Sequence, residues 1–119
     1  MILVIDDEEL IRESIQDILE MTGIQTLCAA NGQAGLELFK AQRPDIQAIL
    51  LDLAMPVMNG PETLSKIREL DPTIHVILSS GYTEKETRSK IVSDRGVIFL
   101  QKPYSIDILI AKVNKALQS

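Results

Sequence analysis

Short apolar segments alternate five times with longer amphipathic segments, and this alternation limits the possible folds more than any other feature of the sequence. It is typical of βα units that build a parallel sheet covered by helices. Three of the apolar segments are nearly continuous Ile, Val and Leu, as expected of strands buried on both faces, whereas the second is more polar and is predicted to lie at an edge. The predicted strands are Ile2 to Ile5, Gln25 to Ala29, Ala48 to Leu51, His75 to Leu78 and Val97 to Leu100.

Capping and helix-breaking residues delimit the helices between these strands. The second helix is predicted to run from residue 31 or 32 to residue 42, with Leu38 and Phe39 facing inward. The third is predicted over residues 60–70, and the last begins after Ser105, a favourable N-cap. The chain is therefore predicted to be an α/β protein.

The fourth helix is predicted to be weakly anchored. Thr83 and Glu86 have the spacing of a capping box, but residues 84–90 include no apolar side chain. Ile91 and Val92 would hold most of the segment in place. Two interpretations stay open: a loosely packed surface helix, and an element near balance that a neighbouring site can shift.

Length and composition exclude several classes of protein. The 119 residues, 45% hydrophobic and 24% charged, fit one compact domain over residues 1–119. A net charge of −5 disfavours a nucleic-acid-binding surface and favours cations or basic partners. The single cysteine, Cys28, excludes an internal disulfide, and no apolar run approaches the roughly 18 residues that span a bilayer. We therefore predict a cytoplasmic domain without membrane contact.

Polar residues follow four of the predicted strands at their carboxyl ends, where parallel α/β sheets form their binding crevices. Acids after a strand often charge the first turn of the next helix, and this explains Glu8 and Glu9 better than the two acids before them. The acid after the third strand follows a wholly apolar run, so it begins at the edge of the core. The candidate site residues are Asp6, Asp7, Asp52, Ser80 and Lys102.

Three carboxylates beside one lysine predict a divalent cation. Asp6, Asp7 and Asp52 bring three negative charges to neighbouring strand ends. Lys102 offsets only one of them, so a divalent ion would balance the site. Oxygen-only ligands suit Mg²⁺ or Mn²⁺. With the metal bound, Asp52 can act as a nucleophile that forms a carboxyl-phosphate, while Lys102 and the Ser80 hydroxyl stabilise the phosphoryl oxygens.

Four motifs carry a resemblance to a known family. Together, at βα spacing, they resemble the receiver domain of two-component response regulators over essentially the whole chain. The resemblance implies a flavodoxin-like (βα)5 three-layer sandwich with a parallel five-stranded sheet of order 2-1-3-4-5. The third and fourth motifs resemble in particular the receivers of hybrid sensor histidine kinases. The motifs are Val4-Ile-Asp-Asp-Glu8, Leu51-Asp-Leu-Ala-Met-Pro56 followed by Asn59-Gly60, Leu78-Ser-Ser-Gly-Tyr82 and Phe99-Leu-Gln-Lys-Pro103.

The resemblance implies a role for each acidic residue. Asp52 would accept a phosphoryl group from a phosphohistidine of a sensor histidine kinase or a histidine phosphotransfer domain. Asp7 and Asp52 would bind Mg²⁺ directly, together with the backbone carbonyl of Ala54, and Asp6 would act through a metal-bound water. Such a domain promotes its own phosphorylation and dephosphorylation and signals by them, so it is not an enzyme in the usual sense.

The resemblance also implies a conformational switch. The Ser80 hydroxyl would close on the phosphoryl group, and the Phe99 ring would turn inward into the space released. Lys102 would bridge to the phosphoryl oxygens, and its bond to Pro103 would be a cis peptide. The signal would leave through the face formed by the fourth helix, the fifth strand and the fifth helix. Because the sequence ends just after that helix, we expect a stand-alone regulator or a module tethered to a hybrid kinase.

Three other classes of protein fit part of the pattern. A haloacid-dehalogenase-type phosphatase needs a D-x-D pair after its first strand, where this chain has Asp6-Asp7-Glu8. An FMN-binding module would need a Ser/Thr/Gly-rich phosphate loop there, and four acids would repel the phosphate. A phosphorylation-independent interaction module on the same fold typically loses an acid, the acceptor or the lysine, and this chain keeps them all. That module remains the main alternative.

Overall fold

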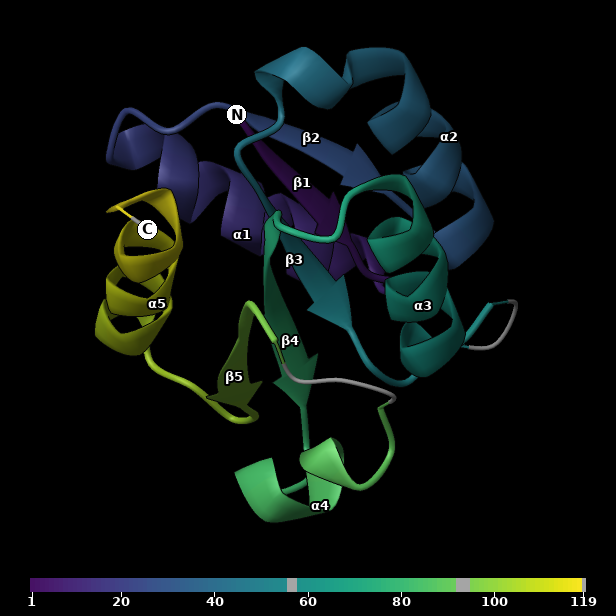
Figure 1. The fold of residues 1–119 in the computed structure, drawn as a ribbon. Helices are drawn as coiled ribbons and strands as arrows, with labels where there is room; N and C mark the ends of the chain where they lie inside the picture. The colour runs from purple at the N-terminus through teal and green to yellow at the C-terminus, as the bar shows by residue number, and fades with distance from the viewer. Residues whose placement is uncertain (56–57, 92–94, 119) are drawn as a thin grey trace.

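The computed structural model describes residues 1–55, 58–91 and 95–118, in which strands and helices alternate (Figure 1). A short 3-10 helix, η1 (Arg43–Asp45), follows the second α-helix. The strands are β1 (Ile2–Ile5), β2 (Thr26–Ala29), β3 (Ala48–Asp52), β4 (His75–Ser80) and β5 (Val97–Gln101). The α-helices are α1 (Glu9–Met21), α2 (Gly32–Gln42), α3 (Gly60–Leu70), α4 (Glu84–Arg88) and α5 (Ile106–Gln118).

The sheet is parallel and has the strand order β2-β1-β3-β4-β5, which confirms the prediction. The more polar β2 lies at one edge, as its sequence indicated. Three strands extend beyond the predicted apolar runs, through Asp52, Ser80 and Gln101. Backbone pairing does not require apolar side chains, so Asp52 pairs with Ser79 although both are polar. Of the candidate site residues, Asp52 and Ser80 therefore lie in strands, whereas Asp6, Asp7 and Lys102 come directly after strands.

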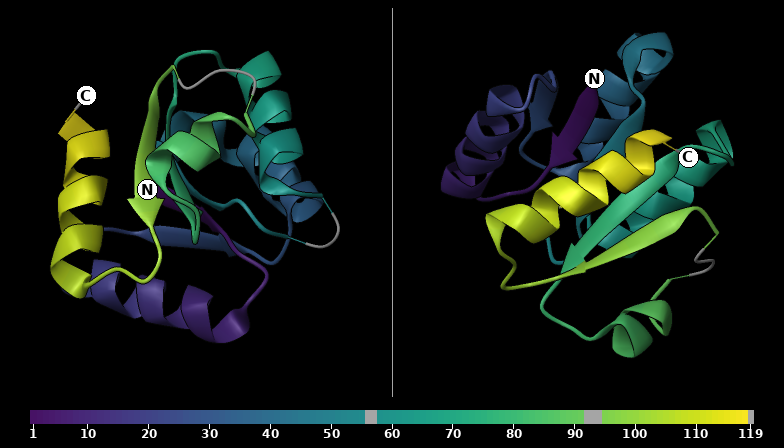
Figure 2. Two further views of the ribbon diagram at one scale, coloured as in Figure 1. Left: turned by 90° about the horizontal axis from the view of Figure 1, so that it is seen from below. Right: turned by 90° about the vertical axis from the view of Figure 1, so that its left-hand side faces the viewer.

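Helices cover both faces of the sheet (Figures 1 and 2). Because side chains alternate along a strand, Leu3 and Ile5 of β1 pack on one side with α2 and α3. Ile2 and Val4 pack on the other side with α1 and α5. The predicted three-layer sandwich is confirmed. Among the described residues, no helix is both long enough and apolar enough to cross a membrane.

The inward face of α2 differs from the prediction at one position. Leu36 and Phe39 are buried, whereas Leu38 is only half-buried and packs at the margin of the core. Residues three apart lie on one face of a helix, so a helix that buries Phe39 also buries Leu36 and turns Leu38 aside. The predicted N-cap of α5 is confirmed, because the Ser105 hydroxyl accepts a hydrogen bond from the Ile108 amide at 3.2 Å.

The predicted capping box of α4 is confirmed, and it stabilises a helix of only five residues. The Thr83 hydroxyl accepts from the Glu86 amide at 3.2 Å, and the Glu86 carboxylate accepts from the Thr83 amide at 3.1 Å. Thr87, which was not among the predicted anchors of the helix, is 1% exposed and holds it against the core. Ile91 is half-buried against the core, while Val92 lies outside the described residues. Figure 1 shows α4 at the margin of the molecule, apart from the other helices.

The first turn of α3 packs directly against the end of β3. The Gly60 amide donates to the Leu53 carbonyl at 2.8 Å, and the Asn59 side chain caps the helix by accepting from the Glu62 amide at 2.8 Å. A Cβ atom on Gly60 would lie 2.7 Å from the Leu53 oxygen and 2.9 Å from the Asp52 oxygen. The Asn59-Gly60 pair thus lets α3 approach the backbone beside Asp52.

Replacing Gly60 with alanine is expected to destabilise the fold. The added methyl group meets backbone atoms that cannot move without shifting β3, so the free energy of unfolding should fall by about 1–2 kcal/mol in urea titrations. Gly81→Ala is the matched control, because a Cβ there has no atom within 4 Å. Equal urea midpoints for the two variants would contradict this prediction, because they would show that the structure accommodates a methyl group at position 60 without losing stability.

Candidate functional site

Two buried carboxylates and one lysine meet at the carboxyl ends of three strands. Asp6 follows β1 and is 3% exposed, and Asp52 ends β3 and is 4% exposed. Lys102 follows β5, and its Nζ lies 3.3 Å from Oδ1 of Asp52 and 4.0 Å from Oδ2 of Asp6. Acidic side chains are rarely buried this fully unless they are paired. The structure therefore brings together three of the residues predicted from the sequence.

The loop after β1 adds two exposed carboxylates to this site. Oxygen atoms of Asp6, Asp7 and Glu8 lie within 4.8 Å of one another. Oδ1 of Asp6 accepts a hydrogen bond from the Glu8 amide at 2.9 Å, which fixes the turn. Glu8 was not among the predicted site residues, because the dipole of α1 explains an acid at its position, although a run of acids at a strand end is a signal that includes it. Closely spaced carboxylate oxygens are the donors that Mg²⁺ and Mn²⁺ prefer, so these residues fit such an ion.

Burial makes the charged form of both inner carboxylates unfavourable. It raises the pKa of Asp52 to about 6, although the Lys102 ammonium and the Ala54 amide, 3.3 Å from Oδ1, both lower it. Burial likewise raises the pKa of Asp6. For Lys102, burial lowers the pKa, but attraction to Asp52 and Asp6 outweighs it, so the ammonium stays charged. One lysine thus compensates two buried carboxylates incompletely, and an added cation would be favourable.

Ser80 lies beside this cluster, at the end of β4. It is 5% exposed, and its hydroxyl accepts a hydrogen bond from the Tyr82 amide at 3.0 Å. Its carbonyl accepts from the Lys102 amide at 2.7 Å, so a backbone hydrogen bond joins the ends of β4 and β5 at these two residues. The bond between Lys102 and Pro103 is a cis peptide.

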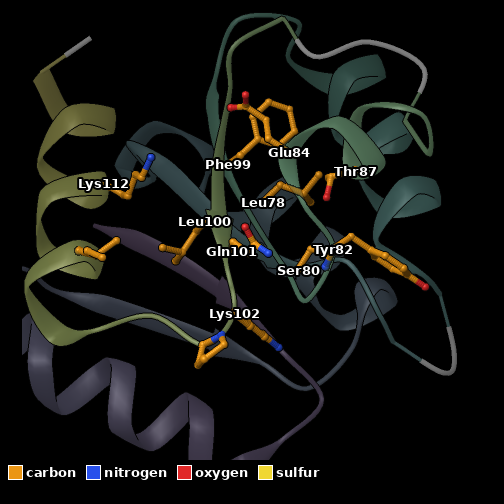
Figure 3. Close-up of a pocket in the computed structure, with 12 residues that line it drawn as sticks. Leu78, Ser80, Tyr82, Glu84, Thr87, Phe99, Leu100, Gln101, Lys102 and Lys112 are labelled. Carbon is orange, nitrogen blue, oxygen red and sulfur yellow. The ribbon is translucent and has the colours of Figure 1, made fainter.

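Phe99 does not lie with the other predicted site residues. Figure 3 shows its ring beside Glu84 and turned away from Ser80. The ring is half-buried, and the guanidinium carbon of Arg88 lies 5.1 Å from its centroid. The carboxylate of Glu84 holds the Arg88 guanidinium at 3.7 Å. This contact depends on how α4 packs beside β5, so no pattern in the sequence predicts it.

A groove joins the site to the outer surface of the molecule (Figure 3). It has a volume of about 770 Å³ and lies between α4, β5 and α5. One end reaches Ser80 and Lys102, and the lining continues past Phe99 to Glu84 of α4 and Lys112 of α5. The groove therefore connects the strand ends with side chains of α4 and α5.

A parallel (βα)5 sheet that carries buried acids and a lysine at its carboxyl edge defines a specific class of signalling domain. Residues 2–114 match the family model of the response regulator receiver domain. The chain belongs to that family.

Known relatives include both separate and embedded receiver domains. Sporulation initiation phosphotransferase F of Bacillus subtilis is 33% identical over 116 residues, which are 98% of this chain and 92% of that protein. Regulatory protein AtoC of Escherichia coli is 34% identical over 98% of this chain, but the match covers only 25% of AtoC. The match to the sensor kinase/phosphatase LuxN of Vibrio harveyi, 35% identical, covers 12% of LuxN. The chain thus spans a quarter or less of these last two proteins.

Solved structures agree with this assignment. The receiver domain from the hybrid histidine kinase CckA has a TM-score of 0.82 and 32% identity, with 98% of each chain covered. A response regulator receiver domain protein from Clostridium thermocellum has a TM-score of 0.89 and 29% identity, with 98% and 93% covered. The predicted resemblance to receivers, including those of hybrid kinases, is confirmed.

Proposed function

We propose that residues 1–119 form one receiver domain that accepts a phosphoryl group on Asp52 in a Mg²⁺-dependent reaction. The observation that carries the proposal is the buried Asp52 carboxylate, 3.3 Å from the Lys102 ammonium and at the same sheet edge as the acidic cluster. The donor is a phosphohistidine of a sensor histidine kinase or a histidine phosphotransfer domain. Such donors act in the cytoplasm, either as separate proteins or in a hybrid kinase that contains the receiver.

The transfer exchanges one bond to phosphorus for another. An oxygen of Asp52 attacks phosphorus, the bond from phosphorus to the imidazole nitrogen breaks, and that nitrogen keeps the electron pair. The Lys102 ammonium and the Ser80 hydroxyl donate to the phosphoryl oxygens. Asp6, Asp7, Asp52 and the Ala54 carbonyl would hold Mg²⁺, which supplies positive charge to the phosphoryl oxygens when it is bound.

Phosphorylation then changes the surface around α4, β5 and α5. A phosphoryl group adds about −1.5 to −2 charges at the site. Ser80 moves toward it, and the Phe99 ring turns inward into the space released. Support comes from the groove, which is lined by Ser80, Lys102 and Phe99 and is continuous with α4 and α5. The short α4, anchored by Thr87, is the element that this change shifts most easily.

Arg88→Ala is expected to favour the switched conformation before any phosphorylation. The cation–π contact with Phe99 exists only while the ring points outward, and at an exposed site such a contact contributes about 0.5–1 kcal/mol. Its loss should raise the switched population about two- to fivefold. The chemical shifts of the β5 amides measure this population. Their position in the unphosphorylated variant, between the shifts of the resting and of the phosphorylated wild type, gives the switched fraction. Lys85→Ala removes a charge from the same helix, and identical resting shifts in the two variants would contradict the prediction.

Intact mass spectrometry with a small-molecule phosphodonor and with a phosphohistidine donor tests the proposed function. The expected result is one phosphoryl adduct that requires Mg²⁺ and is absent from Asp52→Asn. No adduct from either donor would instead favour the phosphorylation-independent interaction module. An adduct that persists in Asp52→Asn would place the acceptor elsewhere.

A further inference from the structure

Arg12 ties helix α1 to the acidic loop. It is half-buried, and its Nη1 donates a hydrogen bond to the main-chain carbonyl of Asp6 at 2.8 Å. The Asp6 amide donates to the Ala29 carbonyl at 3.2 Å, and the Asp6 carboxylate accepts a hydrogen bond from the Glu8 amide. The backbone at Asp6 is therefore fixed through its N–H, its carbonyl and its side chain.

This contact determines the direction in which the chain leaves β1. The peptide between Asp6 and Asp7 is planar, so a fixed Asp6 carbonyl also fixes the start of Asp7. Asp7 is exposed, and its place within the acidic cluster depends on its backbone more than on packing. The hydrogen bond from Arg12 thus acts on a ligand candidate that the core does not hold in place.

The partner of Arg12 is a neutral carbonyl, which keeps the carboxylates available. Neighbouring carboxylates within 4.8 Å repel one another, and the guanidinium brings a positive charge to the same loop. Across the described parts of the chain, Arg12 forms no ion pair within 4.0 Å with Asp6, Asp7 or Glu8. Arg12 therefore does not compete with a cation for the carboxylate oxygens of this cluster.

We infer that Arg12 is a positioning residue for the divalent metal site. The inference rests on the proposed function, because it assumes that the acidic cluster binds Mg²⁺. Groups that hold metal ligands in place typically change metal affinity 10- to 100-fold when they are removed. A purely electrostatic role of Arg12 predicts the opposite change in metal affinity, because loss of a nearby positive charge would tighten Mg²⁺ binding.

Isothermal titration with Mg²⁺, repeated with Mn²⁺, tests this role. Arg12→Met keeps the apolar stem but removes the donor, and it should weaken binding about tenfold. Arg12→Lys can still donate to the carbonyl and should bind within about threefold of wild type. Lys40→Ala, which removes an exposed charge from α2, should bind as wild type does. If Arg12→Met does not fold, Arg12→Gln replaces it with the same expected weakening.

Phosphorylation kinetics provide a second readout. The Mg²⁺ concentration that gives half the maximal rate should rise about tenfold in Arg12→Met, while the rate at saturating Mg²⁺ should stay within about twofold of wild type. Affinity in Arg12→Met equal to or tighter than that of Lys40→Ala would overturn the role of Arg12 alone. Absence of Mg²⁺ binding in the wild type would overturn the metal site of the proposed function, and the role of Arg12 with it.

Discussion

Replacing Lys102 with alanine is expected to slow phosphorylation of Asp52 about a hundredfold, which is the usual cost of removing one charge-stabilising donor from a reaction centre. The ammonium lies 3.3 Å from the carboxylate that receives the phosphoryl group, and the Lys102 side chain is half-buried. It also holds down the pKa of Asp52, which burial raises. The variant should therefore lose further activity as the pH falls toward 7, because more of its Asp52 becomes protonated.

Initial rates at saturating Mg²⁺, followed by intact mass at pH 7 and pH 8.5, measure both effects. Lys66→Ala removes an exposed charge from α3 and should phosphorylate at the wild-type rate. A Lys102→Ala rate within threefold of that control at both pH values would mean that the ammonium contributes to structure only.

Asp52→Asn is expected to stabilise the metal-free protein at pH 7.5 by about 3 kcal/mol, because it removes a carboxylate that folding buries in its charged form. The pKa of Asp52 is raised by burial from 3.8 to about 6, so the folded state binds this proton more tightly than the unfolded state does. The stability that protonation contributes is complete below pH about 4 and is lost as the pH rises through about 6. Asparagine does not ionise and shows no such loss.

Urea unfolding in a chelator, at pH 4 to 7.5, measures the difference between the two proteins. This comparison cancels the titration of groups that do not interact with Asp52. The stability advantage of Asp52→Asn should grow as the pH rises. A stability advantage that does not change with pH would contradict the cost of burying the charged Asp52 carboxylate. In a separate titration, added Mg²⁺ should stabilise the wild type more than the variant.

The sequence predicted the sheet and its polar edge because both depend on local patterns. Continuous apolar runs identify buried strands, and the residue after each run lies at the carboxyl edge whatever the surroundings. Asp52 and Lys102 could be assigned to one site for this reason, although they are 50 residues apart.

Other features depend on packing and could not be predicted. The burial of Thr87 requires α4 to lie against β5, and a threonine in a polar segment gives no apolar signal. The contact between Arg88 and the Phe99 ring depends on how α4 packs beside β5, and the contact from Arg12 depends on where α1 begins relative to Asp6. Each is a contact between elements, whereas periodicity reports on one element at a time.

The most direct test of the central claim is to locate the phosphoryl group on the chain. Borohydride reduction of the phosphorylated protein converts an aspartyl phosphate to homoserine, which peptide mass spectrometry can assign to one residue. Homoserine is expected at position 52 and at no other position. Homoserine at Asp6 or Asp7, or an acid-labile phosphate on His75 in place of an acyl phosphate, would contradict it.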